Sequence, residues 1–238
     1  MKEIIPIINT QKYSNIEGRS TNNLNVQLTK YIGSGQIGDV YETEINIGNK
    51  IKKFVVKKFK NTEGVTAIEH ANKAFDGYKL AKEAKLKVFP TYRLGEDKES
   101  ILMTRPNLDE CFVFSPGRDI QTEIKEAEIK LSKEDISKIA HEVFQEAIKA
   151  SQSGIELYFD SYFFILDKKT TKDIDFLIGD FDNVKKKNSD RVLQENIINA
   201  DYVLKCLITE YLRHLNLEMN EYIDMLKDIY KQYKPIDE

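Results

Sequence analysis

A glycine-rich stretch in the first quarter of the chain has a spacing suited to binding phosphate. It reads Gly33-Ser34-Gly35-Gln36-Ile37-Gly38 and is followed by Asp39-Val40. Backbone amides approach phosphate oxygens closely only where no Cβ intervenes, and glycine adopts unusual backbone angles at low cost. The same spacing occurs in dinucleotide-binding folds, where a helix follows, and in ordinary hairpins. Because Val40 to Ile45 reads as a strand, the dinucleotide interpretation is disfavoured and the hairpin stays open.

A lysine follows the glycines at a distance that makes it a second candidate. Lys57 lies 19 residues after Gly38, inside a run of β-branched and aromatic residues that predicts a strand. Its neighbour Lys58 would point to the opposite face of that strand. Lys57 could supply a positive charge to a phosphate, or it could be a surface lysine on an edge strand.

A third candidate is acidic and lies in the second half of the chain. Asp180 and Asp182 follow a predicted β-hairpin, in the run Ile178-Gly-Asp-Phe-Asp-Asn183. Asp180 could hold Mg²⁺, which prefers hard oxygen ligands, with Asp182 as a second ligand. Alternatively, Asp180 caps a turn and Asp182 is simply solvated.

Two groups of elements must position these residues. Residues 1–25 are polar and predict an extension with little structure. Five strands are expected at 26–32, 40–45, 53–59, 88–94 and 100–104, with one helix over 64–86. The later residues predict a long helix over 119–152 with a start signal at Ser132, a hairpin of 162–166 with 174–178, and two helices in 190–233 broken near Asn216.

Composition excludes several functional classes. The net charge of −3 gives no general case for nucleic acid or an anionic membrane as partner. Cys111 and Cys206 form neither a disulfide framework nor a zinc pattern, which favours a reducing compartment. No apolar run is long enough for a membrane-spanning helix, and the N-terminus does not read as a signal peptide.

Taken in order, these features resemble the protein-kinase-like superfamily from about Val26 to Val184. The glycine stretch matches G-x-G-x-x-G-x-V, Phe54-Val-Val-Lys57 resembles V-A-I-K, and Asp180-Phe-Asp182 resembles D-F-G with Asp in place of Gly. The resemblance implies an α+β, two-lobed fold. An N-lobe over 26–104 would hold a five-stranded antiparallel sheet and one helix, and a mainly helical C-lobe would cover 105–238, together forming one domain.

The resemblance also implies ligands and roles. ATP and Mg²⁺ would be the cofactors, with the glycine stretch and Val40 around the nucleotide and Lys57 against its α- and β-phosphates. A helix carboxylate would hold Lys57, and Glu69 and Asp76 are both candidates, seven positions apart on one helical face. Met103 would lie near the back of the adenine pocket.

The chain departs from the family pattern in two places. No H-R-D-x-x-x-x-N is present before the hairpin, and the base position falls on or near Tyr158. Asp160, the nearest carboxylate apart from Glu156, could accept a hydroxyl proton, replace the missing Asn as a metal ligand, or have no chemical role. An activation segment with A-P-E is also missing, which resembles the reduced kinases that bacterial pathogens deliver into host cells.

These features predict a serine/threonine protein kinase of bacterial effector type that acts on a host or partner protein. It would be cytoplasmic or secreted into a host cell, and its oligomeric state is not predicted. Two alternatives stay open: a pseudokinase that binds nucleotide or a partner without phosphoryl transfer, and a small-molecule kinase or nucleotidyl transferase.

Overall fold

The computed structural model describes residues 11–13, 24–26, 28–47, 49–90, 92–115, 130–187, 189, 191–211 and 219–234. The chain divides into two compact units, which we call the sheet unit (residues 1–78 with 89–106) and the helical unit (79–88 with 107–238). The sequence predicts a division after Thr104, and the sheet unit ends at Pro106.

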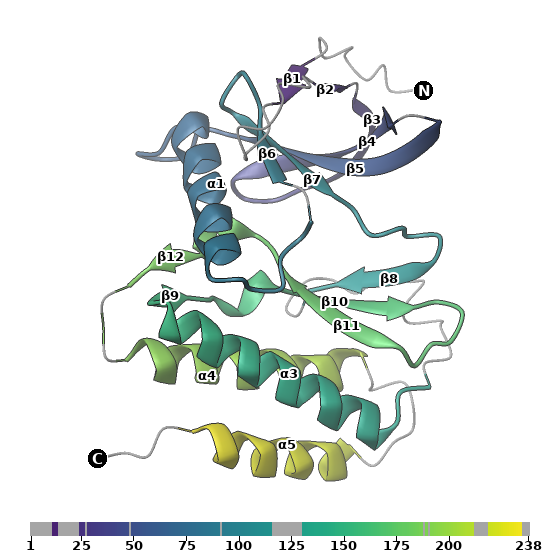
Figure 1. Cartoon of the computed structure of the whole chain (residues 1–238), viewed down its shortest axis with the longest axis vertical. Helices are drawn as coiled ribbons and strands as arrows, with labels where there is room; N and C mark the ends of the chain where they lie inside the picture. The colour runs from purple at the N-terminus through teal and green to yellow at the C-terminus, as the bar shows by residue number, and fades with distance from the viewer. Residues whose placement is uncertain are drawn as a thin grey trace. The chain divides into compact units, whose positions relative to one another are not determined.

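The sheet unit is built on five antiparallel strands (Figure 1). Their bounds are β3 Leu28–Ser34, β4 Gly38–Ile47, β5 Lys50–Phe59, β6 Tyr92–Leu94 and β7 Ser100–Thr104. The strand order is β3-β4-β5-β7-β6, with every neighbouring pair antiparallel. The predicted sheet is therefore confirmed. The structure adds a two-stranded sheet of β1 Gln11–Tyr13 and β2 Leu24–Val26 in the region expected to have little structure.

The two faces of the five-stranded sheet carry different side chains because strand residues alternate in direction. One face carries an apolar cluster made of Val26, Ile45, Phe54, Val56 and Leu102. On the other face Phe59 stacks on His70 of helix α1, Ala67–Glu83, with 6.3 Å between the ring centroids. Helix α1 thus covers the face of the sheet to which the odd-numbered residues of β5 point.

The described residues of the helical unit form three long helices and several short strands. The helices are α3 Lys133–Gln152, α4 Val192–Cys206, which continues as a π-helix over Leu207–Tyr211, and α5 Met219–Tyr233. The strands are β8 Cys111–Phe114, β9 Ile155–Glu156, β10 Tyr162–Asp167, β11 Ile174–Ile178 and β12 Lys185–Lys186. Strand β10 lies between β11 and β8, and β12 pairs with β9. The three helices pack against one another (Figure 1).

The elements differ from the predicted ones at identifiable points. Helix α3 begins at Lys133 because the Ser132 side chain and the Asp135 carboxylate each accept the other residue's backbone N–H, a complete capping box. The predicted helical residues 119–129 and the predicted break near Asn216 lie outside the described residues. Strand β8 was not predicted. Among the described residues, no helix is both long and apolar enough to cross a bilayer.

Candidate functional site

The glycine stretch forms the turn between β3 and β4, and we call residues 33–38 the glycine turn. The Gly35 backbone N–H donates to the Gly38 carbonyl oxygen at 2.8 Å and closes the turn. Gly33 lies opposite Val40 in the strand register, and Ser34 lies opposite Asp39. The turn is therefore an ordered hairpin end that leads directly into β4.

The three glycines of this turn are not equivalent. A Cβ on Gly38 would lie 2.7 Å from the Lys58 carbonyl oxygen, so β5 requires glycine there. A Cβ on Gly33 would meet nothing within 4 Å, and one on Gly35 would meet only the Gly38 oxygen, at 3.8 Å. None of the three has a left-handed φ. Backbone angles therefore do not explain these glycines: Gly38 is needed for packing, while Gly33 and Gly35 border open space.

Lys60, which the sequence reasoning did not single out, holds the glycine turn in place. Its ammonium lies 2.6 Å from the Asp39 carboxylate and donates to the Ser34 hydroxyl at 2.8 Å. Its backbone N–H donates to the Ile37 carbonyl at 2.9 Å. Hydrogen bonds from Lys60 and Ser34 lower the pKa of Asp39. One residue at the end of β5 thus contacts both sides of the turn.

The strand register brings several predicted residues to one face of the sheet. Lys57 pairs with Val40 on β4 and with Ile101 on β7. Val55, two positions earlier on β5, pairs with Met103. Directly opposite residues in antiparallel strands share a face. Val40, Lys57 and Met103 therefore lie on the same side of the sheet.

This side is the one that α1 covers. The Lys57 ammonium lies 5.1 Å from the centroid of the Phe59 ring, which stacks on His70. Burial, and then the charges of Lys73 and Lys57, lower the pKa of His70. Lys58 pairs in register with Asp39 and therefore faces the other way. The expected difference in direction between Lys57 and Lys58 is a consequence of this register.

The two candidate partners of Lys57 have different environments. Glu69 Oε2 accepts the backbone N–H of Thr66 at 2.7 Å and its hydroxyl at 2.8 Å, while the Thr66 hydroxyl accepts the Glu69 N–H. This capping box at the start of α1 occupies Glu69, and its hydrogen bonds lower the Glu69 pKa. Asp76 is an exposed residue further along α1.

In the helical unit, two short turns carry the predicted acidic residues, and we call them the acidic turns. One is the 3₁₀ turn Phe159–Ser161, which contains Asp160, and the other is Asp180–Asn183. The Gly179 N–H donates to the Ser161 carbonyl at 2.8 Å, next to the pairing of Tyr162 with Ile178. The β10–β11 hairpin therefore brings the two turns side by side.

A side-chain contact also joins the acidic turns. The amide nitrogen of Asn183 donates to the Asp160 carboxylate, at 3.1 Å from Oδ2 and 3.4 Å from Oδ1. The sequence reasoning did not assign a role to Asn183. This contact orients the Asp160 carboxylate and links it to the residues that follow Asp180.

Asp180 has a backbone conformation that few residues adopt. Its φ of 49° and ψ of 52° are left-handed, a region in which Asp and Asn are enriched among non-glycine residues. Phe181 is fully buried and Asp182 is 8% exposed. Strained positions of this kind cluster at functional sites.

The predicted Mg²⁺ ligands, Asp180 and Asp182, belong to one of the acidic turns. Among the described residues, no group of three or more His, Cys, Asp or Glu side chains could form a metal centre. Mg²⁺ in nucleotide enzymes is typically held by one or two carboxylates together with phosphates and water. Asp180 and Asp182 are two carboxylates, the number that such a smaller donor set requires, and they stay predicted ligands.

Glu156, four positions before Asp160 in the chain, is held by lysines. Its side chain is 2.8 Å from the Lys187 ammonium and 3.1 Å from that of Lys185, and Lys187 also contacts Glu195 at 2.6 Å. Burial raises the pKa of Glu156, but the hydrogen bonds from Lys187 and Lys185 outweigh it, so the pKa is lowered. Glu156 therefore stays ionised and ties β9 to the chain after the acidic turns.

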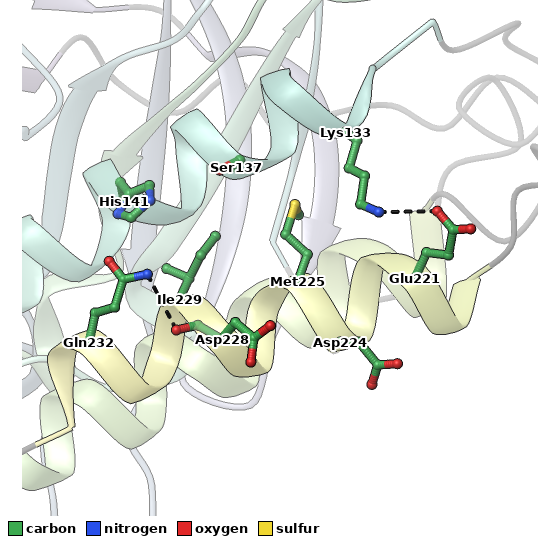
Figure 2. A pocket seen from close by; sticks show the side chains of 9 residues that line it. All are labelled: Lys133, Ser137, His141, Glu221, Asp224, Met225, Asp228, Ile229 and Gln232. Atoms are coloured by element: carbon green, nitrogen blue, oxygen red, sulfur yellow. Dashed lines mark hydrogen bonds and ion pairs between the residues drawn. The ribbon is translucent and has the colours of Figure 1, made fainter.

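A groove of about 560 Å³ lies in the helical unit, between α3 and α5 (Figure 2). Lys133 and Glu221 form an ion pair of 3.0 Å across one end of it, and His141 projects from α3 at the other. Met225 and Ile229 of α5 also line the groove. None of the predicted site residues lines this groove.

Comparisons with known proteins find solved structures with a similar fold but no relative by sequence. No protein-family model matches the chain, and no curated protein matches it. Among solved structures, the ROP18 kinase domain in complex with AMP-PNP and sucrose is 12% identical, with a TM-score of 0.51 over 95% of this chain and 87% of that chain.

A second solved structure is the kinase domain of PF14_0431. It is 14% identical, with a TM-score of 0.46 over 77% of this chain. The match covers 64% of that chain, which is less than two thirds of its length. At 12% identity the likeness to the ROP18 kinase domain concerns the fold, which agrees with the α+β architecture described above. The chain has a protein-kinase-like fold.

Proposed function

We propose that the chain is an ATP-dependent phosphotransferase that modifies a serine or threonine hydroxyl on a partner or host protein. The observation that carries the proposal is the arrangement of Val40, Lys57 and Met103 on one face of the sheet, next to the glycine turn. Gly33 and Gly35 border space that a Cβ could fill, so phosphate oxygens could approach the backbone there.

The proposal gives each part of the site a role. The glycine turn and Lys57 bind the phosphates, and the apolar side chains of Val40 and Met103 contact the adenine. Asp76 is the proposed partner of Lys57, since Glu69 is occupied in the helix cap. The AMP-PNP reported for the ROP18 kinase domain supports nucleotide binding by a chain of this fold.

In the helical unit, Asp180 and Asp182 would hold Mg²⁺, which supplies positive charge near the phosphates. Asp160, oriented by Asn183, would accept the proton of the acceptor hydroxyl. The hydroxyl oxygen forms a bond to the γ-phosphorus, and the bond from that phosphorus to the oxygen of ADP breaks. The products are ADP, a phosphorylated side chain and a proton on Asp160.

Labelled ATP with Mg²⁺ tests this proposal. We expect label from the γ-phosphate to appear in the chain itself or in proteins of a host lysate. Lys57→Met should reduce transfer about 100-fold or more, the size typical for losing a group that stabilises developing charge. Lys58→Met is the matched control, because Lys58 occupies the next position and faces away, and it should transfer normally. Equal activity of the two variants would contradict the role of Lys57.

A second matched pair of variants tests the proposed metal ligand Asp180. Asp180→Asn keeps the size of the side chain but removes its charge, and it should abolish Mg²⁺-dependent transfer while leaving the fold intact. Asp173→Asn changes an exposed carboxylate just before β11 and should have no effect. Transfer that survives Asp180→Asn would reject Asp180 as the metal ligand.

A second candidate is a nucleotide-binding module without transfer, which the missing H-R-D-x-x-x-x-N motif before the β10–β11 hairpin favours. A thermal shift with ATP and Mg²⁺ but no label transfer would support this candidate. Mass spectrometry of labelled products would separate a gain of phosphate from a gain of nucleotide.

The proposed likeness to reduced effector kinases rests on the short connection after the acidic turns. Strand β12 is Lys185–Lys186, and α4 already begins at Val192. This leaves little chain for a loop ordered by phosphorylation. Delivery of the tagged chain into host cells by a bacterial secretion system would test the effector assignment.

A further inference from the structure

An exposed apolar surface lies directly beside Asp160. The rings of Tyr158 and Phe159 are 4.7 Å apart between centroids, and Phe159 meets Tyr202 of α4 edge-on at 5.1 Å. Ile198 precedes Tyr202 by one helical turn and shares its face of α4. We call these four residues the aromatic surface.

The exposure of this surface is unusual for α4. The helix buries Ile197, Ala200 and Val203 completely, as expected for a helix with one apolar face. Yet Tyr158, Ile198 and Tyr202 are 46%, 49% and 47% exposed. Single exposed apolar residues are ordinary, whereas a contiguous group marks a site of interaction.

Two hydrogen bonds, one of them buried, fix α4 relative to the Asp160 turn. Asn196 of α4 accepts the Leu157 N–H at 2.8 Å, and Asn199 donates to the Leu157 carbonyl at 3.0 Å. Leu157 immediately precedes Tyr158 in the chain, and Asp160 follows Phe159. The position of α4 relative to the Asp160 turn is therefore set by the fold.

We propose that the aromatic surface binds a large apolar side chain of a protein acceptor, close in sequence to the serine or threonine that receives phosphate. This inference rests on the proposed phosphotransferase function. An extended acceptor segment advances about 3.3 Å per residue, so its residues one to three positions from the hydroxyl lie within about 10 Å of Asp160. Tyr158 and Phe159 lie two positions and one position before Asp160, so they fall within the same range of the chain.

The shape of the surface favours a polypeptide over a small acceptor. It extends from the Asp160 turn onto the neighbouring helix, and it offers three rings and one aliphatic side chain. Ile198 lies one helical turn from Tyr202 on the same face of α4, which extends the surface along the helix. A flanking leucine or phenylalanine would bury both its own surface and these rings.

A set of peptides tests the inference through binding. Each fluorescent peptide holds one central serine, and phenylalanine replaces alanine at one position from three before to three after it. Anisotropy gives dissociation constants for the full chain. We expect one flanking phenylalanine to tighten binding about tenfold over the all-alanine peptide. The double variant I198S/Y202S should lose that preference, whereas Tyr202→Phe should keep it.

Two controls distinguish binding at the aromatic surface from the effect of losing any exposed apolar residue and from misfolding. Ile51→Ser changes a more exposed apolar residue, at 67%, in the sheet unit and should leave the preference unchanged. Circular dichroism and melting should show that I198S/Y202S folds normally. Equal preference in this variant and the wild type, or no preference in the wild type, would overturn the inference. A wild-type dimer in sedimentation that I198S/Y202S dissociates would assign the surface to self-association and overturn it as well.

Label transfer from ATP to the same peptides distinguishes this inference from the proposed function. Selective binding without transfer would reject the phosphotransferase and retain the docking surface. Transfer to all peptides alike would retain the phosphotransferase and reject the surface. Selective binding with selective transfer would support both.

Discussion

The glycine turn and the acidic turns both depend on contacts between distant positions, but these contacts lie in different kinds of structure. In the glycine turn, Lys60 contacts Ser34 across 26 positions and also contacts Asp39, while the Gly35–Gly38 bond closes the turn locally. Asn183 joins the two acidic turns by reaching Asp160 across 23 positions, and Glu156 and Lys187, which flank these turns, are joined across 31. The first site is built within one sheet, and the second depends on the folding of a whole unit.

The two regions are therefore sensitive to different kinds of substitution. The glycine turn relies on the close approach of two strands, so added volume should damage it most. The acidic turns rely on buried polar groups, whose loss leaves other buried groups without partners. Substitutions that change only volume or only hydrogen bonding therefore separate the two regions.

The largest effect is expected from Asn196→Ala in the helical unit. Asn196 is fully buried and hydrogen-bonds the Leu157 N–H, the Ile155 carbonyl and the Ser151 hydroxyl, each within 3 Å. Each buried group left without a partner costs about 1–3 kcal/mol, so we expect a loss of about 3 kcal/mol in the free energy of unfolding. Urea unfolding followed by circular dichroism measures it.

Asn199→Ala is the matched control for this substitution. Asn199 lies on the same helix and donates one hydrogen bond, to the Leu157 carbonyl, from a partly buried position. We expect a loss of about 1 kcal/mol. Equal losses for the two variants would show that the buried network does not hold the acidic turns more firmly than a single bond.

A smaller effect is expected from Gly38→Ala in the glycine turn. Its Cβ would lie 2.7 Å from the Lys58 carbonyl oxygen, which is backbone and cannot swing away. Overpacking of this kind costs about 1–3 kcal/mol, and we expect about 2 kcal/mol. Gly35→Ala, with 3.8 Å of room, should change stability by less than about 0.5 kcal/mol yet weaken the ATP-induced thermal shift. A destabilised Gly35→Ala would contradict the open space inferred there.

Features that arise from local periodicity could be predicted from the sequence. Alternation along β5 predicts that Lys57 and Lys58 face opposite ways, and the apolar runs predict the sheet and the β10–β11 hairpin. The capping box of Thr66 and Glu69 is also a local signal, because its two residues stand three positions apart at the start of a helix. That signal favours Asp76 over Glu69 as the proposed partner of Lys57.

Contacts between distant positions could not be predicted in this way. Strand β8 is a run of four residues whose pairing with β10 crosses about 50 positions, and no local pattern encodes such a pairing. The Asn183–Asp160 and Asn196–Leu157 bonds likewise join residues with no fixed spacing. Asparagine in those positions could equally be a turn or surface residue.

A change in pH should weaken the helical unit through Glu156. The lysine contacts lower its pKa below the ordinary value of 4.5, so its stabilising contribution is complete above that value and is lost as pH falls through the lowered pKa. Glu156→Gln removes the titrating group. The melting temperature of the wild type should exceed that of Glu156→Gln at pH 6–7, and the gap should shrink toward pH 3. Glu134→Gln, an exposed change on α3, controls for general acid effects. A gap that is constant with pH would exclude Glu156 as the titrating group.

The smallest effect is expected where charge alone holds the glycine turn. Lys60→Met removes the ion pair with Asp39 and the bond to Ser34, but its side chain is 42% exposed, so water screens the charges. Exposed pairs contribute about 0–1 kcal/mol, and we expect about 0.5 kcal/mol at low salt and less at 1 M salt. The hairpin keeps its backbone bonds, including the Lys60 N–H to Ile37, because the substitution leaves them unchanged. A loss as large as that of Gly38→Ala would mean that the ion pair, and not strand packing, fixes the turn, and the contrast with the acidic turns would then fail.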